Sequence, residues 1–250
     1  MDIKDYLDSE GILDVTLNDL NKLISAEERR KIEEIANRAM GYKYNFEAHQ
    51  QYYTMICQMR INGVPLIVPT TGTARSEIEQ SAPIILEHIK NDILILDVAS
   101  GIGHKTRFYG LNVEGRVIGL DINQAVLDIA NRRKNGNMAY IRGDVFKLPF
   151  RDELFDSVLY CNAIQEDGVF YGIYGDGNYD DMKLEKIKEL SRVLKINGKM
   201  IIGHNGFDDY PEEVIEAMAR NGIEIAESYT IDYSKNNKER INHVAVGVKK

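Results

Sequence analysis

Short apolar runs alternate with amphipathic segments from about residue 81 to the C-terminus. The amphipathic segments carry apolar residues at helical spacing, or the polar and glycine residues typical of helix ends. The apolar runs are too short for helices, so we expect strands buried on both faces at residues 93–97, 117–120, 139–142, 155–161 and 199–203. This alternation predicts an α/β fold built on an open, mostly parallel sheet.

Two further apolar stretches, at residues 223–233 and 243–248, surround the polar segment 235–237. They predict an antiparallel pair that completes the sheet. We therefore expect a doubly wound, seven-stranded sheet in which one strand is antiparallel.

Residues 1–80 lack the alternation of strands and predict helices. Ser25 with Glu28 is a capping box that begins a helix ending at Gly41, and a further helix is expected over residues 46–60. Ser81 and Pro83 predict the start of the helix before the first strand. We expect residues 1–80 to form a helical segment and residues 81–250 to form the α/β domain.

A turn of small residues follows the first predicted strand. Ala99, Ser100, Gly101 and Gly103 allow a sharp turn and the close approach of another molecule to the backbone. A helix is predicted over residues 104–111, and its first N–H groups lack partners within the helix. Strand, turn and helix together predict the first half of a βαβ nucleotide-binding unit.

An aspartate stands at the end of each of three successive strands. Asp97 ends the first, Asp121 the second, and Asp144 follows the third. Asp121 lies roughly 20 residues beyond the turn, where such folds place an acid that accepts hydrogen bonds from ribose hydroxyls. We expect the three carboxylates to lie along one edge of the sheet.

Four segments in the same order and spacing resemble the class I S-adenosylmethionine-dependent methyltransferases, which are Rossmann-like. The segments are Leu-Asp-Val-Ala-Ser-Gly-Ile-Gly at 96–103, Gly-Leu-Asp at 119–121, Gly-Asp-Val at 143–145, and Phe-Asp-Ser-Val-Leu-Tyr-Cys-Asn-Ala at 155–163. The resemblance covers about residue 81 to the C-terminus. Ala99 departs from it, since the family usually has a glycine there.

The resemblance implies that the cofactor is S-adenosyl-L-methionine and that the chain is a methyltransferase. Asp121 would then accept the ribose hydroxyls, and Asp144 the adenine amino group. Asp97 would serve the amino-acid tail or, alternatively, brace the turn. The predicted cofactor-binding residues are Asp97, Ala99, Ser100, Gly101, Gly103, Asp121, Ile122, Gly143, Asp144, Val145, Cys161, Asn162 and Ala163.

The acceptor side is less defined by the sequence. Glu166 and His204 are the candidate general bases, although some methyl transfers need no base and His204 could be a hydrogen-bonded bystander. Four tyrosines are candidates for a lid over the substrate, with ordinary packing as the alternative: Tyr52, Tyr53, Tyr171 and Tyr174. If the N-terminal segment is a lid, deleting residues 1–60 should abolish methyl transfer more than cofactor binding.

Composition narrows the class of partner. The net charge of -8 argues against a nucleic acid held by its phosphates, so we expect a small-molecule substrate. Cys57 and Cys161 have no metal-ligand spacing and predict reduced thiols in the cytoplasm. We expect no metal, because the acidic pairs at 180–181 and 208–209 suit solvated surface charges, and no membrane-spanning segment is apparent.

Four other functions remain open at this stage. A nicotinamide-dependent oxidoreductase would need a third glycine where Thr106 stands. An aminopropyl transferase would show additional acids around the cofactor's tail. A methyltransferase acting on a peptide or protein, and a module that binds the cofactor without turnover, would share the sequence pattern described here.

Overall fold

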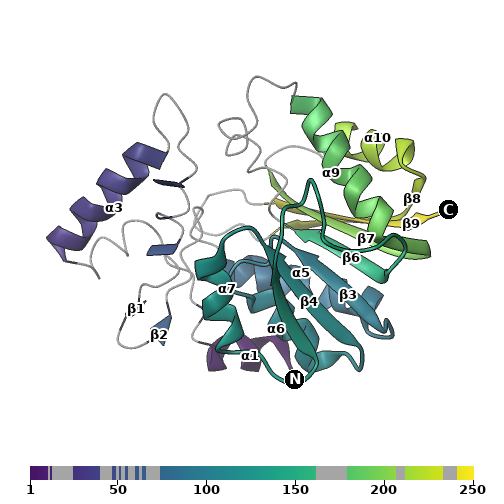
Figure 1. Ribbon diagram of the computed structural model, residues 1–250. Coiled ribbons are helices and arrows are strands. Elements are labelled where there is room, and N and C mark those ends of the chain that lie inside the picture. Colours follow the sequence, from purple (N-terminus) through teal and green to yellow (C-terminus); the bar gives the residue numbers. More distant parts are fainter. Residues whose placement is uncertain are drawn as a thin grey trace. The chain divides into compact units, whose positions relative to one another are not determined.

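A computed structural model describes residues 1–10, 12, 25–39, 47, 48, 51, 54, 55, 60, 61, 64, 65, 74–161, 179–206, 212–232 and 241–250 (Figure 1). These residues fall into two compact units that divide between Glu79 and Gln80. The larger unit contains the sheet and the candidate site.

The larger unit is built on one seven-stranded sheet in the order β5-β4-β3-β6-β7-β9-β8. All neighbouring pairs are parallel except those that β9 makes with β7 and β8. The predicted fold class, with one antiparallel strand, is therefore confirmed. The strands are β3 (Leu94–Val98), β4 (Arg116–Asp121), β5 (Met138–Arg142), β6 (Phe155–Cys161), β7 (Leu194–Gly206), β8 (Ile223–Asp232) and β9 (Ile241–Lys249).

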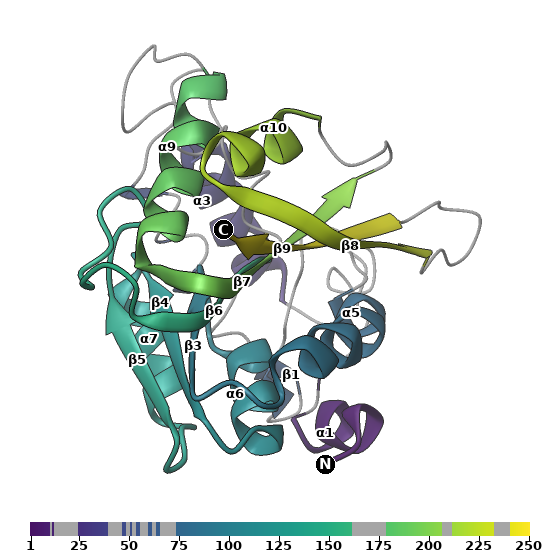
Figure 2. The ribbon, with the colours of Figure 1, turned by 90° about the vertical axis from the view of Figure 1, so that its right-hand side faces the viewer.

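Helices cover both faces of this sheet. Figure 2 shows α9 (Tyr179–Val193) and α10 (Glu212–Arg220) together on one side and α6 (His104–Asn112) on the other. The remaining helix after β4 is α7 (Gln124–Asn131), whose N-cap Asn123 accepts a hydrogen bond from the Ala125 N–H at 3.0 Å. Helices α6, α7 and α9 connect β3 to β4, β4 to β5 and β6 to β7, whereas residues 143–154 between β5 and β6 form no helix.

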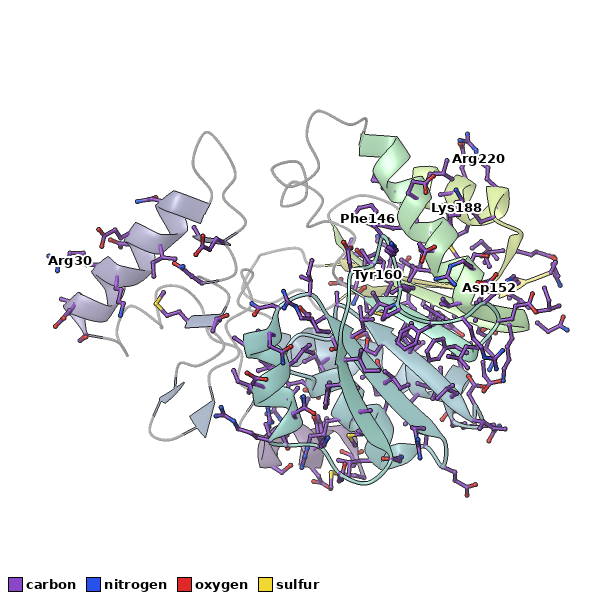
Figure 3. All side chains as sticks on the ribbon, in the orientation of Figure 1. Arg30, Phe146, Asp152, Tyr160, Lys188 and Arg220 are labelled. Atoms are coloured by element: carbon purple, nitrogen blue, oxygen red, sulfur yellow. The ribbon has the colours of Figure 1, made fainter. Side chains whose placement is uncertain are left out.

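The main hydrophobic core lies between the sheet and the helices α9 and α10. Leu96 and Val98 of β3 enter it with Tyr160 of β6, which is 1% exposed. On the outside of the same helices, Lys188 and Arg220 are exposed to solvent (Figure 3). Successive residues of a strand point to opposite faces of the sheet. Asp97, between Leu96 and Val98, therefore faces α6.

The amino ends of the strands are fixed by charged side chains far from the predicted site. Asp156 accepts hydrogen bonds from the N–H groups of Ile93 at 3.2 Å and Leu94 at 2.9 Å. Its other oxygen pairs with Lys195 at 2.6 Å. These donors lower the pKa of Asp156, against the opposing effect of burial. This carboxylate serves the register of β3 and β6 rather than chemistry.

The smaller unit contains α1 (Ile3–Ser9), α3 (Ala26–Ala39), β1 (Arg60–Ile61) and β2 (Val64–Pro65). The first turns of α5 (Ala74–Ile89) also belong to it. Arg75 of α5 pairs with Asp8 of α1 at 2.7 Å and donates to the Ile12 carbonyl at 2.9 Å. Arg75 therefore ties α1 to α5.

Two expectations for the first 90 residues are wrong. The helix expected over residues 46–60 does not reach its predicted end, because Arg60 lies in β1 and pairs with Pro65 of β2. The helix before the first strand begins at Ala74 instead of Ser81, and Pro83 lies inside it. Proline fits the first turn of a helix best, so its presence suggested a start that the structure places seven residues earlier.

Candidate functional site

The carboxyl ends of β3, β4 and β5 bring the predicted cofactor residues to one edge of the sheet. Asp97 lies in register with Gly119, and Asp121 with Arg142. The turn that follows β3 is joined to β4 by the Ser100 N–H, which donates to the Leu120 carbonyl at 3.0 Å. The turn and the three aspartates therefore form one local arrangement.

The turn between β3 and α6 uses left-handed backbone at three residues. The φ angles are 57° at Ala99, 55° at Gly101 and 78° at Gly103. Gly103 is the N-cap of α6, and its N–H donates to the Ser100 carbonyl at 2.9 Å. Ala99 thus occupies the conformation that favours glycine, at the position where the family usually has one.

Replacing Ala99 with glycine should stabilise the protein. The left-handed conformation destabilises a residue with a Cβ by roughly 1–2 kcal/mol, and glycine removes this strain. Glycine also makes the unfolded chain more flexible, which lowers the stability by roughly 0.4–1 kcal/mol. We expect a net gain of about 0.5 kcal/mol in the free energy of urea unfolding. Asn197→Gly is the matched control, because Asn197 also has a positive φ of 62° and asparagine tolerates it. A loss of stability in Ala99→Gly would contradict the strain assigned to the turn.

Asp121 links the turn to the strand that it ends. One carboxylate oxygen accepts the Gly101 N–H at 2.9 Å, and the other accepts the Asn123 N–H at 2.9 Å. Burial raises the pKa of Asp121, and these N–H donors oppose that rise. A carboxylate has about four lone-pair sites, so acceptor capacity remains on both oxygens for a pair of neighbouring hydroxyls.

Asp97 lies beneath the turn and is 5% exposed. Its Oδ2 accepts a hydrogen bond from the Thr106 hydroxyl of α6 at 2.5 Å. Burial raises the pKa of Asp97 to about 6, which the Thr106 hydrogen bond and Lys105 partly oppose. Of the two roles considered for Asp97, this geometry favours bracing the turn against α6.

Asp144 follows β5 and closes a tight local turn. Its Oδ1 accepts the Phe146 N–H at 3.0 Å, and the residue bridges to Lys147. Val145 is 7% exposed and belongs to the core, whereas Ile122, Gly143 and Asp144 are half-buried. These residues stand at the ends of β4 and β5, on the same edge as Asp121.

The end of β6 carries the residues predicted for the methyl end of the cofactor. Cys161 is half-buried and lies in register with Gly203 of β7. A Cβ placed on Gly203 would lie 3.2 Å from the Cys161 sulfur, so the glycine makes room for that side chain. His204 comes next along β7, in register with His243 of β9. Outside the described residues lie Asn162, Ala163, Glu166, Tyr52, Tyr53, Tyr171 and Tyr174.

Three residues near the turn, two buried and one half-buried, were not singled out as functional from the sequence. In the sequence, Thr106 was noted only because a nicotinamide-dependent oxidoreductase would need a glycine there. In the structure, its hydroxyl donates the hydrogen bond to Asp97. His104 begins α6 and is 6% exposed, and burial, followed by the charge of Arg107, lowers its pKa to about 3. Tyr140 of β5 donates its hydroxyl to the Gly103 carbonyl at 3.3 Å. Only strand register brings Tyr140 to the turn, so no local motif could have revealed it.

Among the described residues, no helix has the length and apolar character needed to cross a membrane. Within the same ranges, no group of three or more histidine, cysteine, aspartate or glutamate side chains is placed to hold a metal ion.

Comparison with known proteins places the site in a family context. Residues 96–202 match the model of a family described as "Methyltransferase domain". The matched region begins in β3 and ends in β7, so it contains the turn and all three aspartates. This segment is similar to methyltransferase domains, and the seven-stranded sheet around it is the Rossmann-like fold that the sequence resemblance predicts.

A curated relative is the ubiquinone/menaquinone biosynthesis C-methyltransferase UbiE of Pseudomonas paraeruginosa (strain DSM 24068 / PA7). It is 26% identical over 163 residues, which make up 58% of this chain and 59% of the relative. The corresponding protein of Wigglesworthia glossinidia brevipalpis is 32% identical over 118 residues, 44% of this chain and 42% of the relative. The chain thus spans about half the length of the curated relatives that it matches.

Solved structures agree on the fold. The PH0226 protein from Pyrococcus horikoshii OT3 has a TM-score of 0.57 and 19% identity, and the match covers 82% of this chain and 100% of that one. For a TehB-like SAM-dependent methyltransferase from Corynebacterium glutamicum the TM-score is 0.52 and the identity 19%, with coverages of 68% and 86%. These structures, at 19% identity, show that the chain shares their fold.

Proposed function

We propose that this protein transfers the methyl group of S-adenosyl-L-methionine to a small-molecule acceptor. The observation that carries the proposal is the arrangement around Asp121, whose two oxygens each accept one backbone N–H and keep acceptor capacity at the sheet edge. Such a carboxylate suits the two neighbouring hydroxyls of a ribose.

The residues present fit this cofactor in a second respect. The Ser100 Oγ is buried and has no hydrogen-bond partner among the described residues. Buried polar atoms normally have partners, so this hydroxyl suits a ligand that brings a polar group to the turn. The first N–H groups of α6 add a partial positive charge that suits the carboxylate of the cofactor's amino-acid tail.

When bound, the cofactor supplies a methyl group on a positively charged sulfur that is already reactive. The protein's task is then to hold donor and acceptor in line and to exclude water. Asp121 would orient the ribose, and Asp144 with Ile122 and Val145 would hold the adenine. Asp97, through Thr106, would keep the turn and α6 at a fixed spacing.

The second part of the proposal is that the methyl acceptor is a small molecule. The UbiE relatives are named for methylation at carbon in ubiquinone and menaquinone biosynthesis, which are pathways of small molecules. The net charge of -8 disfavours a nucleic acid acceptor. Glu166 and His204 stay the candidate bases, Tyr52, Tyr53, Tyr171 and Tyr174 the candidate lid, and the cytoplasm the proposed location.

Methyl transfer from isotopically labelled cofactor tests the acceptor class directly. The protein is incubated with the labelled cofactor and, separately, with a small-metabolite fraction and a protein fraction of a cell extract. We expect label to enter the small molecules. Label confined to protein would contradict the small-molecule acceptor but not methyl transfer. Binding without any transfer would instead identify a module that holds the cofactor without turnover.

A further inference from the structure

Tyr140 occupies an unusual place in the sheet. It lies on β5 in register with Gly119 of β4, and Gly119 lies in register with Asp97 of β3. Residues in register point to the same face, and Asp97 bonds to α6, so all three positions face that helix. Because Gly119 has no side chain, the tyrosine ring can lie across it toward the turn.

The ring fills the space between two glycines. A Cβ placed on Gly119 would lie 2.6 Å from the tyrosine Cδ1, and one placed on Gly103 would lie 2.7 Å from Cε1 and from Cζ. Real Cβ atoms essentially never approach other atoms this closely, so neither position accepts a side chain while the ring is there. The glycine of β4 is therefore explained mainly by Tyr140, with the Ser100 Oγ 2.9 Å from such a Cβ, whereas the glycine at 103 also needs its φ of 78°.

The hydroxyl of Tyr140 reaches the start of α6. It donates to the Gly103 carbonyl at 3.3 Å, the same carbonyl that accepts the first hydrogen bond of the helix from the Arg107 N–H at 2.8 Å. Burial, followed by the charge of Asp97, raises the pKa of the phenol to about 12. The phenol thus keeps its proton at neutral pH and remains a donor.

We propose that Tyr140 is a positioning residue for cofactor binding, because its ring and hydroxyl hold the turn at 99–103 in the conformation that presents Gly101 to Asp121. This inference rests on the proposed function, since the ligand is taken to be S-adenosyl-L-methionine. Tyr140 acts through the turn, because its ring packs against Gly103 and its hydroxyl donates to the Gly103 carbonyl. It should therefore affect the affinity for the cofactor far more than the rate of transfer once the cofactor is bound.

Calorimetric titration of S-adenosyl-L-methionine into single and double variants tests this role. Tyr140→Ala should raise the Kd by roughly 10-fold, because a turn displaced by a fraction of an ångström loses much of its binding. Tyr140→Phe keeps the ring and should change the Kd by no more than about 3-fold. At saturating labelled cofactor, the rate at which both variants label the small-metabolite fraction should stay within about 2-fold of the native rate.

Gly119→Ala provides the sharper test because Gly119 adopts no left-handed φ. Alone, it places a methyl group against the ring and should raise the Kd by roughly 10-fold. In the Tyr140→Ala background the same substitution should add only about 2-fold, because the clash with the ring is gone and only the Ser100 Oγ stays close, at 2.9 Å from such a Cβ. Tyr229→Ala is the matched control. Tyr229 lies on β8, the strand at the opposite end of the strand order from β5, and its hydroxyl bonds to His88.

The outcomes separate the two proposals. If the native protein does not bind the cofactor, the proposed function is overturned. If the native protein binds and Tyr140→Ala binds equally well, or if the effects of Gly119→Ala and Tyr140→Ala simply multiply, the role of Tyr140 is overturned. Circular dichroism verifies folding, and Tyr140→Leu, which retains part of the apolar volume, answers the same question should Tyr140→Ala not fold.

Discussion

Replacing Asp121 with alanine is expected to weaken the binding of S-adenosyl-L-methionine by about 10- to 100-fold, the loss typical when buried hydroxyls are deprived of a charged acceptor. The substitution also removes the acceptor for the Gly101 and Asn123 N–H groups, which lie at 2.9 Å in each case. Both losses act on the cofactor side of the site. Isothermal titration calorimetry at a fixed ionic strength measures the change.

Asp128→Ala is the matched control for this substitution. Asp128 is exposed on α7 and accepts a hydrogen bond from the Gln124 side chain at 2.8 Å, so its loss leaves the sheet edge intact. Asp121→Asn adds a second comparison, because it preserves the shape and loses the charge. An Asp121→Ala variant that binds the cofactor with native affinity would refute the ribose role.

Replacing Asp97 with asparagine should make the protein more stable at neutral and alkaline pH. Asp97 has a native pKa of about 6 against an ordinary value of 3.8, because its charged form is buried. The native state thus binds more protons than the unfolded state between these values, and the free energy of unfolding falls as pH rises through that window. Asparagine has no such charge and can still accept the Thr106 hydrogen bond.

The pH dependence of the difference identifies the cause. The stability of Asp97→Asn relative to the native protein should grow by about 1 to 2 kcal/mol from about pH 5 to about pH 8. Urea unfolding at several pH values measures it, with Asp128→Asn as the exposed control. A difference for Asp97→Asn that does not change with pH would show that the buried carboxylate costs no stability.

Much of the larger unit follows from local sequence signals. The strand predicted at residues 155–161 matches β6 (Phe155–Cys161), and the predicted antiparallel pair matches β8 and β9. β6 and β9 are buried along most of their length, so their apolar runs are nearly continuous and easily distinguished, whereas β8 at the end of the strand order is mostly exposed. Asp121 and Asp144 were placed correctly at strand ends because parallel strands bring those ends to one edge of the sheet.

Other features depend on contacts that sequence spacing does not reveal. β1 and β2 contain two residues each, too few to show a period. Pro83 resembles a helix start, and the turns of α5 before it carry no competing signal. In the sequence, nothing distinguishes Tyr140 from the other residues of its predicted strand. Its contacts with Gly103 and Gly119 arise from the register between β4 and β5.

The most direct test of the account is the titration of S-adenosyl-L-methionine into the native protein. We predict saturable binding of one molecule per chain, with no comparable binding of a nicotinamide dinucleotide. Absence of saturable binding, or binding of the dinucleotide in place of S-adenosyl-L-methionine, would contradict the assignment of the turn at 99–103 and of Asp121 to this cofactor.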